Sequence, residues 1–353
     1  MNDGEGAVEK ALRRQIYSAA DVLVVVIVHI PHLLGYFSNR LSILQLCLGS
    51  LVAHSPDPVE ILVFDNASCP EVTDYLRGLQ REGGIQHLHR ASRNIGKLAA
   101  MMVTFNAIDR PVVAFNDDDV FFYPNWLEPQ LAILNAFPRV GTVSGVPTLD
   151  GASFAVSAIA PFLEGSAADI SSSDGEIQPE WEADWALSTG RSPDKRMELA
   201  RTTRIPILST AGVRAYAGAT HFQYIAPARL IRRSLPQDWP SNLMGGVREI
   251  DQWLDNAGYL RLSTTNRVAR HMGNYVQRDL QGEAAAMGLK PHLALNRPAL
   301  TIFERLPMKS GRVRSWGRKL YRRLGLVIDG EGLQNLETRR GSVNPIGSLQ
   351  DRK

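Results

Sequence analysis

The chain of 353 residues has a formal net charge of +3, with 44% hydrophobic and 21% charged residues, which is ordinary for a globular protein. Its longest aliphatic run, VLVVVIV at 22–28, is far shorter than the roughly 20 residues that cross a bilayer, which argues against a transmembrane helix. The polar N-terminus lacks the pattern of a signal peptide, and two cysteines without a CxxC motif favour a reducing cytoplasm.

Strand-like and helix-like patterns alternate between residues 21 and 120. The predicted strands cover 22–28, 59–64, 85–89 and 112–115, and the predicted helices cover 40–53, 71–82 and 94–108. Such alternation is typical of an α/β domain with a mostly parallel sheet flanked by helices. Because ligands bind beyond the carboxyl ends of such strands, we expect Asp65 and the run Asp117–Asp119 to face one crevice.

The pattern becomes irregular from about residue 145 to residue 220. The stretch SAADISSSDGEIQPEWEADW is polar and then rich in tryptophan and acid, which indicates an insertion or lid. Regularity returns with an apolar segment at 220–235, a helix near 248–257 and the strand-like YLRLST. The tail after Asp329 is polar and is predicted to be disordered.

Three adjacent aspartates, Asp117, Asp118 and Asp119, follow the apolar run that ends at residue 115. Adjacent carboxylates repel one another, and removing them from water is costly unless they are paired or bind a cation. They therefore mark either a solvated acidic turn or a metal site. Their place between a buried strand and the apolar VFFY favours the metal site. On an extended segment, Asp117 and Asp119 project to the same side.

Five segments resemble the motifs of GT-A fold glycosyltransferases, and are most similar to those of the large inverting family 2. VVAFNDDDVFFYPNWLE resembles the Asp-x-Asp segment, and VEILVFDNAS resembles the second strand, which ends in the acid that contacts the nucleoside. RNIGKLAAMM resembles the start of the helix before the metal strand. REIDQWLDNAGYLRLST resembles the helix with the catalytic base, and VARHMGN the late histidine of the metal site. The resemblance covers about residues 20–275 and implies a Rossmann-like GT-A fold.

The resemblance also implies a divalent cation, Mn²⁺ or Mg²⁺, that stabilises the diphosphate leaving group of a nucleotide-sugar donor. Asp119 would bind this cation directly. Asp117 would reach the ribose or a metal-bound water, so that Asp117 and Asp118 are also donor-binding candidates. His271 is the candidate third ligand, because imidazole suits Mn²⁺. A lone histidine is otherwise more often structural or on the surface, and this alternative stays open.

The remaining donor-binding candidates come from the second and third motifs. Asp65 would accept hydrogen bonds from the base or ribose, although an aspartate there also caps the following turn. Gly96 would permit close backbone approach to the donor, and Arg93 or Lys97 would meet its phosphates. Asn94 is a donor candidate as well, or simply the N-cap of the next helix.

The catalytic base should be a carboxylate that removes the proton of the acceptor hydroxyl as its oxygen attacks the anomeric carbon. The family has adjacent acids at this helix start, whereas here Glu249 and Asp251 are separated by Ile250. Residues two apart on a helix face different ways, so only one of the two should face the site. We favour Asp251, with Glu249 as the alternative.

Acceptor recognition is predicted for the irregular middle of the chain. Trp181 and Trp185 offer aromatic faces for sugar rings, next to carboxylates for the hydroxyls, although tryptophan is more often simply packed. By analogy with the family, His221 and Gln223 in ATHFQ would lie near the acceptor.

The segment KSGRVRSWGRKLYRR at 309–323 holds seven of the 39 basic residues and no acid, which leaves 32 basic against 36 acidic residues elsewhere. It is predicted to form a basic amphipathic helix, which suits an anionic membrane surface. A solvated helix packed on the core is the alternative. The lack of a distributed basic face argues against nucleic-acid binding.

These observations predict a metal-dependent inverting glycosyltransferase that transfers a sugar from a nucleotide-sugar donor to a glycan, a glycolipid or another acceptor hydroxyl. We expect it in the cytoplasm, in peripheral contact with the inner face of a membrane, building a surface polysaccharide or glycolipid. The alternatives are a non-catalytic nucleotide- or glycan-binding protein and a sugar-nucleotide nucleotidyltransferase. The predicted parts are a donor-binding half, an acceptor-binding half with the insertion, a helical extension and a tail, at 20–145, 146–275, 276–327 and 328–353.

Overall fold

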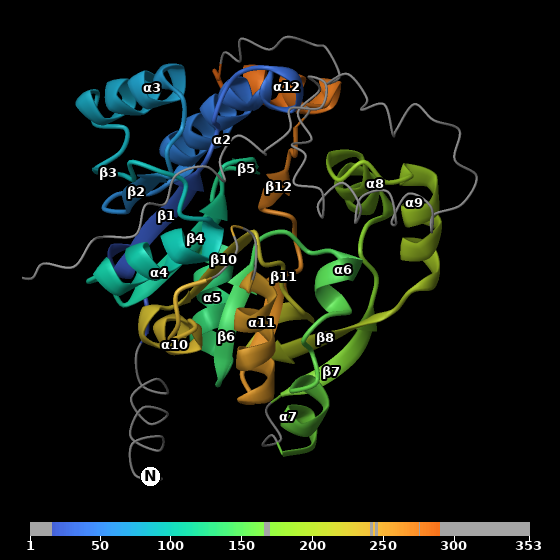
Figure 1. Ribbon diagram of the computed structural model, residues 1–353. Helices are drawn as coiled ribbons and strands as arrows, with labels where there is room; N and C mark the ends of the chain where they lie inside the picture. The colour runs from blue at the N-terminus through green and yellow to red at the C-terminus, as the bar shows by residue number, and fades with distance from the viewer. Residues whose placement is uncertain (1–15, 166–169, 241–242, 244–245, 275, 290–353) are drawn as a thin grey trace, which may run out of the picture.

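The computed structural model describes residues 16–165, 170–240, 243, 246–274 and 276–289 (Figure 1). The predicted basic helix at 309–323 and the predicted tail at 328–353 lie outside these residues. Within the described part of the chain, no helix is both long and apolar enough to span a membrane.

A ten-stranded sheet forms the centre of the molecule (Figure 1). Its strands are β1 (Val22–Val28), β2 (Glu60–Asp65), β3 (His87–Arg90), β4 (Val112–Asp117), β6 (Val140–Ser144), β7 (Ser171–Gly175), β8 (Ile205–Thr210), β9 (Val213–Ala217), β10 (Gln223–Pro227) and β11 (Leu260–Thr264). Their order is β3-β2-β1-β4-β10-β6-β11-β9-β8-β7. A separate two-stranded sheet pairs β5 (Val120–Phe122) with β12 (Ala269–His271).

The pairings of the large sheet are parallel from β3 through β4 and again between β6 and β11. The antiparallel strand β10 lies between β4 and β6, and the sheet is antiparallel from β11 to β7. All of its strands except β7, β9 and β10 therefore run in one direction. The predicted α/β fold with a mostly parallel sheet is confirmed. Of the strands that run the other way, β7 and β9 come from the stretch predicted to be irregular, and β10 comes from the apolar segment that follows it.

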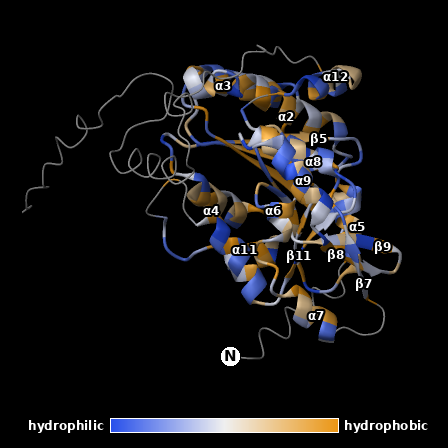
Figure 2. Cartoon of the chain, turned by 90° about the vertical axis from the view of Figure 1, so that its right-hand side faces the viewer, coloured by the Kyte–Doolittle hydropathy of each residue, from blue (hydrophilic) through white to orange (hydrophobic). Residues whose placement is uncertain are grey.

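Helices cover both faces of the sheet. β1 is buried along its whole length, as expected for a central strand that packs helices on both sides. One core joins one face of β1 to α2 (Arg40–His54), α3 (Pro70–Arg81), α5 (Glu128–Ala136) and α12 (Arg278–Ala286). The other core joins its opposite face to α4 (Lys97–Ala107), α10 (Ala228–Ser234) and α11 (Val247–Asn256). Figure 2 shows the resulting pattern, with hydrophobic strands inside and helices such as α9 and α11 carrying hydrophilic residues.

The segment predicted to be irregular contains regular elements. They include α6 (Leu149–Ala152), α7 (Ile159–Gly165), α8 (Pro179–Ser188) and α9 (Pro193–Thr202), in addition to β7, β8 and β9. A third, small core of residues such as Leu149, Ile177, Ile207 and Tyr216 holds part of this segment together. Because its few apolar residues are widely spaced in the sequence, they show no local period, and the prediction of an irregular insertion missed these elements.

Candidate active site

The acidic candidates Asp65 and Asp117–Asp119 lie at the carboxyl ends of β2 and β4. The register pairs Val28 of β1 with Asp65 of β2, and Ile27 with Asp117 of β4, so these strands end at nearly the same level. The beginning of β10 reaches the same edge, where the Asp117 amide donates to the carbonyl of Phe222 at 2.8 Å. Parallel strands therefore place the acidic residues at one edge, as predicted from the sequence.

Each of the three adjacent aspartates is paired with a cationic side chain. Lys97 Nζ lies 2.6 Å from Asp117 Oδ1 and 2.7 Å from Asp117 Oδ2. The guanidinium of Arg40 contacts Asp118 and lies 3.0 Å from Asp119 Oδ2. The acidic run is thus not a solvated turn, because buried charges of the protein offset much of its repulsion.

Arg40 is a site residue that the sequence analysis did not single out. It begins α2, is buried, and also donates to the Gly273 carbonyl at 3.1 Å and to Asn274 Oδ1 at 3.0 Å. An arginine in the first turn of a leucine-patterned helix normally looks like a solvated helix end. The only sequence signal for its role is its position at the start of a helix whose other residues are largely apolar.

The pKa values of the three carboxyls are pushed in different directions. Burial raises the pKa of Asp118 to about 6, although Arg40 opposes this shift. Burial also raises the pKa of Asp117 against the effect of Lys97. For Asp119, burial alone would raise the pKa, but His271 and Arg40 outweigh it and the pKa is lowered. Asp119 is therefore the member of the run that is most firmly held as a carboxylate.

Asp119 and His271 form a pair that fits a metal ion. Asp119 Oδ1 is buried without a hydrogen-bond partner among the described residues, and it lies 3.5 Å from His271 Nε2. One carboxylate oxygen and one imidazole nitrogen suit Mn²⁺. Among the described residues no three histidine, cysteine, aspartate or glutamate side chains are grouped to hold a metal. A cation at this pair would therefore need further oxygen ligands from phosphate and water.

Asp65 is fully buried and holds the turn that leads into α3. Its Oδ1 accepts from the amide of Ser68 at 2.8 Å, and its Oδ2 accepts from Thr73 Oγ1 and Arg90 Nε, each at 3.0 Å. This turn-capping role is the alternative that the sequence left open. Contact of Asp65 with a nucleoside stays a prediction. Arg93, the other basic candidate on this side, is exposed.

A network of amide and imidazole groups joins the ends of β1 and β2 to the start of α4. Asn94 Oδ1 accepts from Asn66 Nδ2 at 3.0 Å, and Asn94 Nδ2 lies 2.9 Å from His29 Nε2. Because that amide nitrogen can only donate, His29 Nε2 accepts and His29 Nδ1–H donates to the Asn66 carbonyl at 2.8 Å. Burial lowers the pKa of His29, which agrees with a neutral ring. His29 and Asn66 were not among the predicted residues, although Asn66 directly follows Asp65.

The start of α4 differs from the prediction. Gly96, and not Asn94, is the N-cap residue, with a φ of 87°, and the helix begins at Lys97. Asn94 Oδ1 instead accepts from the Gly96 amide at 2.8 Å, which turns the chain before the helix. A Cβ at Gly96 would lie 2.9 Å from Leu243 Cα. The glycine is thus required by its backbone conformation and by close contact with another part of the chain.

The two base candidates lie in different environments. Asp251 is buried in α11, its Oδ1 is 3.0 Å from Arg261 Nη2, and its Oδ2 has no hydrogen-bond partner in the described part of the chain. Burial raises the pKa of Asp251 to about 6, while Arg261 and Arg248 oppose the shift. Glu249 is exposed. The helix thus turns the two acids to different surroundings, which agrees with their spacing.

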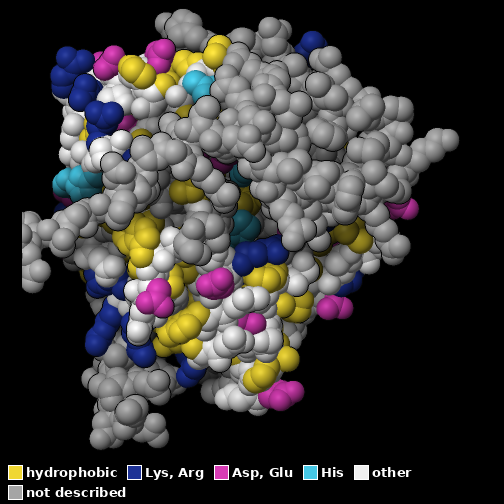
Figure 3. All heavy atoms as spheres, viewed as in Figure 1, with side chains coloured by type: hydrophobic (Ala, Val, Ile, Leu, Met, Phe, Trp, Pro, Cys, Tyr) yellow, Lys and Arg dark blue, Asp and Glu magenta, His cyan; other side chains and the backbone are white. Residues whose placement is uncertain are grey.

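His221 lies among the basic groups of the site. Burial lowers its pKa to about 4, with further lowering by Lys97, Arg248 and Arg261. The ring is therefore neutral near pH 7 and can both donate and accept a hydrogen bond. Figure 3 shows histidine side chains next to lysine or arginine side chains near the middle of the face in view.

The other acceptor candidates are engaged in packing. Trp185 stacks on Phe222 with ring centroids 5.1 Å apart, and Trp181 has the guanidinium of Arg267 at 5.8 Å. Gln223 is buried, accepts from the Gly145 amide at 2.6 Å and donates to a second buried glutamine. A cavity of about 10 Å³ beside the two tryptophans has room for about one water molecule. Sugar contact by these side chains stays a prediction.

The fold and the site define the class: a mixed α/β domain with an acidic run at the carboxyl end of β4, as in GT-A glycosyltransferases. Residues 37–156 match the model of the family described as glycosyl transferase family 2. The predicted resemblance to family 2 is thereby confirmed over this part of the chain. Asp251 and His271 lie outside the matched residues, so the roles predicted for them stay predictions.

Several solved structures are similar to this chain at low identity. GalNAc-T7 with UDP, GalNAc and Mn²⁺ is 13% identical, with a TM-score of 0.42, over 70% of this chain and 43% of that one. Staphylococcus aureus TarS is 12% identical, with a TM-score of 0.39, over 78% of this chain and 40% of that one. The chain thus spans less than half the length of either protein, and at these TM-scores neither bears on its activity. No curated protein matches the chain.

Proposed function

We propose that this protein is a metal-dependent inverting glycosyltransferase that transfers a sugar from a nucleotide-sugar donor to a hydroxyl of a glycan or lipid-linked acceptor. The observation that carries the proposal is the Asp119–His271 pair. Asp119 Oδ1, which has no hydrogen-bond partner among the described residues, faces an imidazole nitrogen at 3.5 Å, in the segment that resembles the acidic motif of family 2. Two lone-pair donors in that arrangement favour a cation between them.

In this proposal Asp119 and His271 hold Mn²⁺ or Mg²⁺, which when bound acts as a Lewis acid toward the donor diphosphate. Lys97 is the first residue of α4 and faces the acidic run, where its ammonium group can turn from Asp117 to a phosphate oxygen. Asn94 and Asp65 support the turns that border the nucleoside. These residues bind and orient the donor. Another residue removes the proton of the acceptor hydroxyl.

Asp251 is the proposed base. It accepts the proton of the acceptor hydroxyl while the oxygen forms a bond to the anomeric carbon and the bond to the diphosphate breaks. A single displacement of this kind inverts the anomeric configuration. With a pKa of about 6, Asp251 is ionised at neutral pH and still basic enough to take up a proton in the transition state. Arg261, at 3.0 Å, fixes the orientation of the carboxylate.

The test measures the release of nucleoside diphosphate from a panel of nucleotide sugars, with and without Mn²⁺. Wild type is compared with Asp119→Asn and with Asp109→Ala, in which an exposed aspartate away from the site is changed. We expect slow, Mn²⁺-dependent donor hydrolysis in wild type and Asp109→Ala that is lost in Asp119→Asn.

Two other outcomes would decide against this function. If no donor yields nucleoside diphosphate and no nucleotide binds in a metal-dependent way, the non-catalytic binding protein is favoured. Release of pyrophosphate on incubation with a sugar phosphate and a nucleoside triphosphate would favour the nucleotidyltransferase. The loop after β1, HIPHLLGYFSNR, lacks the Gly-rich basic sequence of that class, which argues against it.

A further inference from the structure

The ring of His271 is enclosed by the C-terminal turn of α8 and by the start of β10. Its centroid lies 5.0 Å from that of Trp185 and 4.8 Å from that of Phe222, and these two rings stack on each other. On its Nδ1 side the ring meets Ser188 Oγ at 2.8 Å. The imidazole is therefore held in one plane, with Nε2 directed at Asp119.

The hydrogen bonds of Ser188 show which nitrogen of the His271 ring carries the proton. Ser188 Oγ donates to the backbone carbonyl of Trp185 at 2.9 Å. A serine hydroxyl has one proton, so toward His271 the same oxygen can only accept, and the proton of that bond is on His271 Nδ1. In the neutral ring, Nε2 then carries a lone pair, and it faces Asp119 Oδ1 at 3.5 Å, an oxygen to which no described residue donates a hydrogen bond. Two acceptors so placed offer a lone pair each to a metal cation.

We propose that Ser188 is a positioning residue that fixes the Nδ1–H tautomer of His271 and thereby makes Nε2 available as a metal ligand. The inference rests on the metal site of the proposed function, and adds to it a residue from α8, far from both predicted ligands in the sequence. Partners that bind the second nitrogen of a ligand histidine set its tautomer and orientation, and losing them typically costs about 10- to 100-fold in metal affinity.

Gly273 lets the histidine segment pass close to Ser188. A Cβ at Gly273 would lie 2.2 Å from the Ser188 carbonyl oxygen, and the φ of 64° is one that L residues rarely adopt. The glycine of the HMGN motif is thus explained by contact with α8. This contact brings the last turn of α8 against the residues that follow β12.

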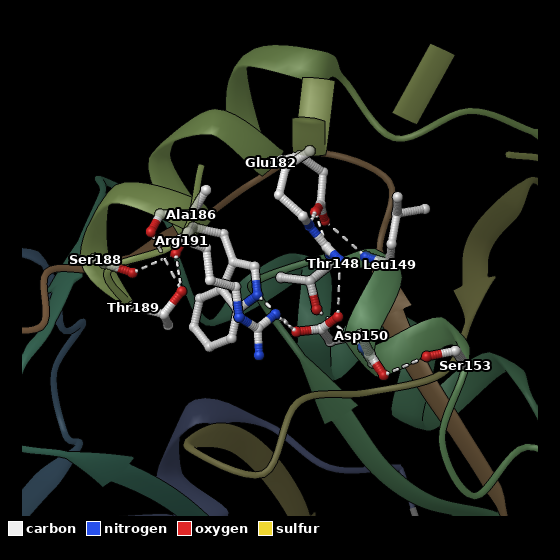
Figure 4. A network of polar contacts seen from close by, with 12 residues as sticks. Thr148, Leu149, Asp150, Ser153, Glu182, Ala186, Ser188, Thr189 and Arg191 are labelled. Atoms are coloured by element: carbon white, nitrogen blue, oxygen red, sulfur yellow. Dashed lines mark hydrogen bonds and ion pairs between the residues drawn. The ribbon is translucent and has the colours of Figure 1, made fainter. Parts of the chain in front are cut away.

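A polar network anchors α8 in that position. Asp150 Oδ2 in α6 accepts from Trp185 Nε1 at 3.0 Å and contacts Arg191, and Asp150 Oδ1 lies 3.0 Å from Arg196 Nη1. Arg196 Nε in turn donates to the buried Glu182 at 2.7 Å. Figure 4 shows Asp150 facing Arg191, and Ser188 and Thr189 together at the end of α8. The segment predicted to be irregular therefore holds α8, and with it Ser188, in place beside His271.

The first test reads the tautomer directly and needs no metal. Long-range ¹H–¹⁵N NMR spectra of the full-length protein at about pH 8 distinguish the two neutral tautomers of histidine. The His271 signal is identified by its absence in His271→Gln. We expect the Nδ1–H form in wild type and in Thr189→Ala, and its loss in Ser188→Ala. Thr189 is the matched control, because its hydroxyl donates to the same Trp185 carbonyl at 2.8 Å. An Nε2–H form in wild type would overturn the inference.

The second test measures Mn²⁺ binding by the loss of the free-ion EPR signal, with UDP or GDP present. Ser188→Ala should weaken binding about 10- to 100-fold. Ser188→Thr, which keeps the hydroxyl, should recover most of the affinity, and Thr189→Ala should bind like wild type. Unchanged binding by Ser188→Ala would overturn the proposed role. If wild type shows the Nδ1–H form but binds no Mn²⁺ with either nucleotide, the metal site fails while the assignment of the tautomer to Ser188 stands.

Discussion

Replacing Arg40 with methionine removes a guanidinium that contacts both Asp118 and Asp119. Arg40 and Asp118 are each about one-tenth exposed at their side chains, so water cannot take over the role of the lost cation. Removing one partner of a buried ion pair typically costs about 3–5 kcal/mol, because the other charge stays buried without compensation. Methionine is also a good helix former, so the start of α2 should not be weakened by helix propensity. We therefore expect Arg40→Met to lower the free energy of unfolding by about 3–5 kcal/mol.

Urea unfolding followed by tryptophan fluorescence measures this loss as a lower midpoint at an unchanged slope. Arg77→Met is the matched control, because Arg77 pairs with Asp74 at 3.8 Å on the surface, where such pairs contribute about 0–1 kcal/mol. Adding Asp118→Asn to Arg40→Met should recover part of the loss, since it removes one uncompensated charge. Equal stability of the Arg40 and Arg77 variants would refute the view that Arg40 neutralises the acidic run.

Three further predictions concern activity and the site. If Asp251 is the base, kcat/KM should rise with pH up to about 6 and level off above it, because the ionised form is active. Asp251→Asn should lower kcat by about 10²- to 10⁴-fold whereas Glu249→Gln keeps the profile, and the reverse would transfer the role to Glu249. Gly273→Ala should lower the free energy of unfolding by at least about 1–2 kcal/mol, because the left-handed backbone and the close Ser188 carbonyl leave no room for a Cβ. An unchanged Tm would contradict this contact. Chelation by EDTA should abolish donor hydrolysis and added Mn²⁺ should restore it; full activity in EDTA would exclude a required cation.

The local pattern of the sequence determined the first part of the fold, up to the acidic run. Strand 22–28 was predicted with the bounds that the structure has, and the helix at 40–53 differs from α2 by one residue at its end. The placement of Asp65 and of the acidic run at strand ends followed from the same pattern. These features could be predicted because hydrophobic periods and turn residues act over a few neighbouring positions.

The tertiary structure alone decided how the charges of the site are balanced. Arg40 reaches Asp119 across 79 residues, and Ser188 reaches His271 across 83. The folding of 145–220 likewise depends on a small core assembled from widely spaced residues. No local period marks such contacts, because they depend on which helices and strands pack together. The sequence therefore determined which residues stand at the strand ends, and packing decided which partners hold them there.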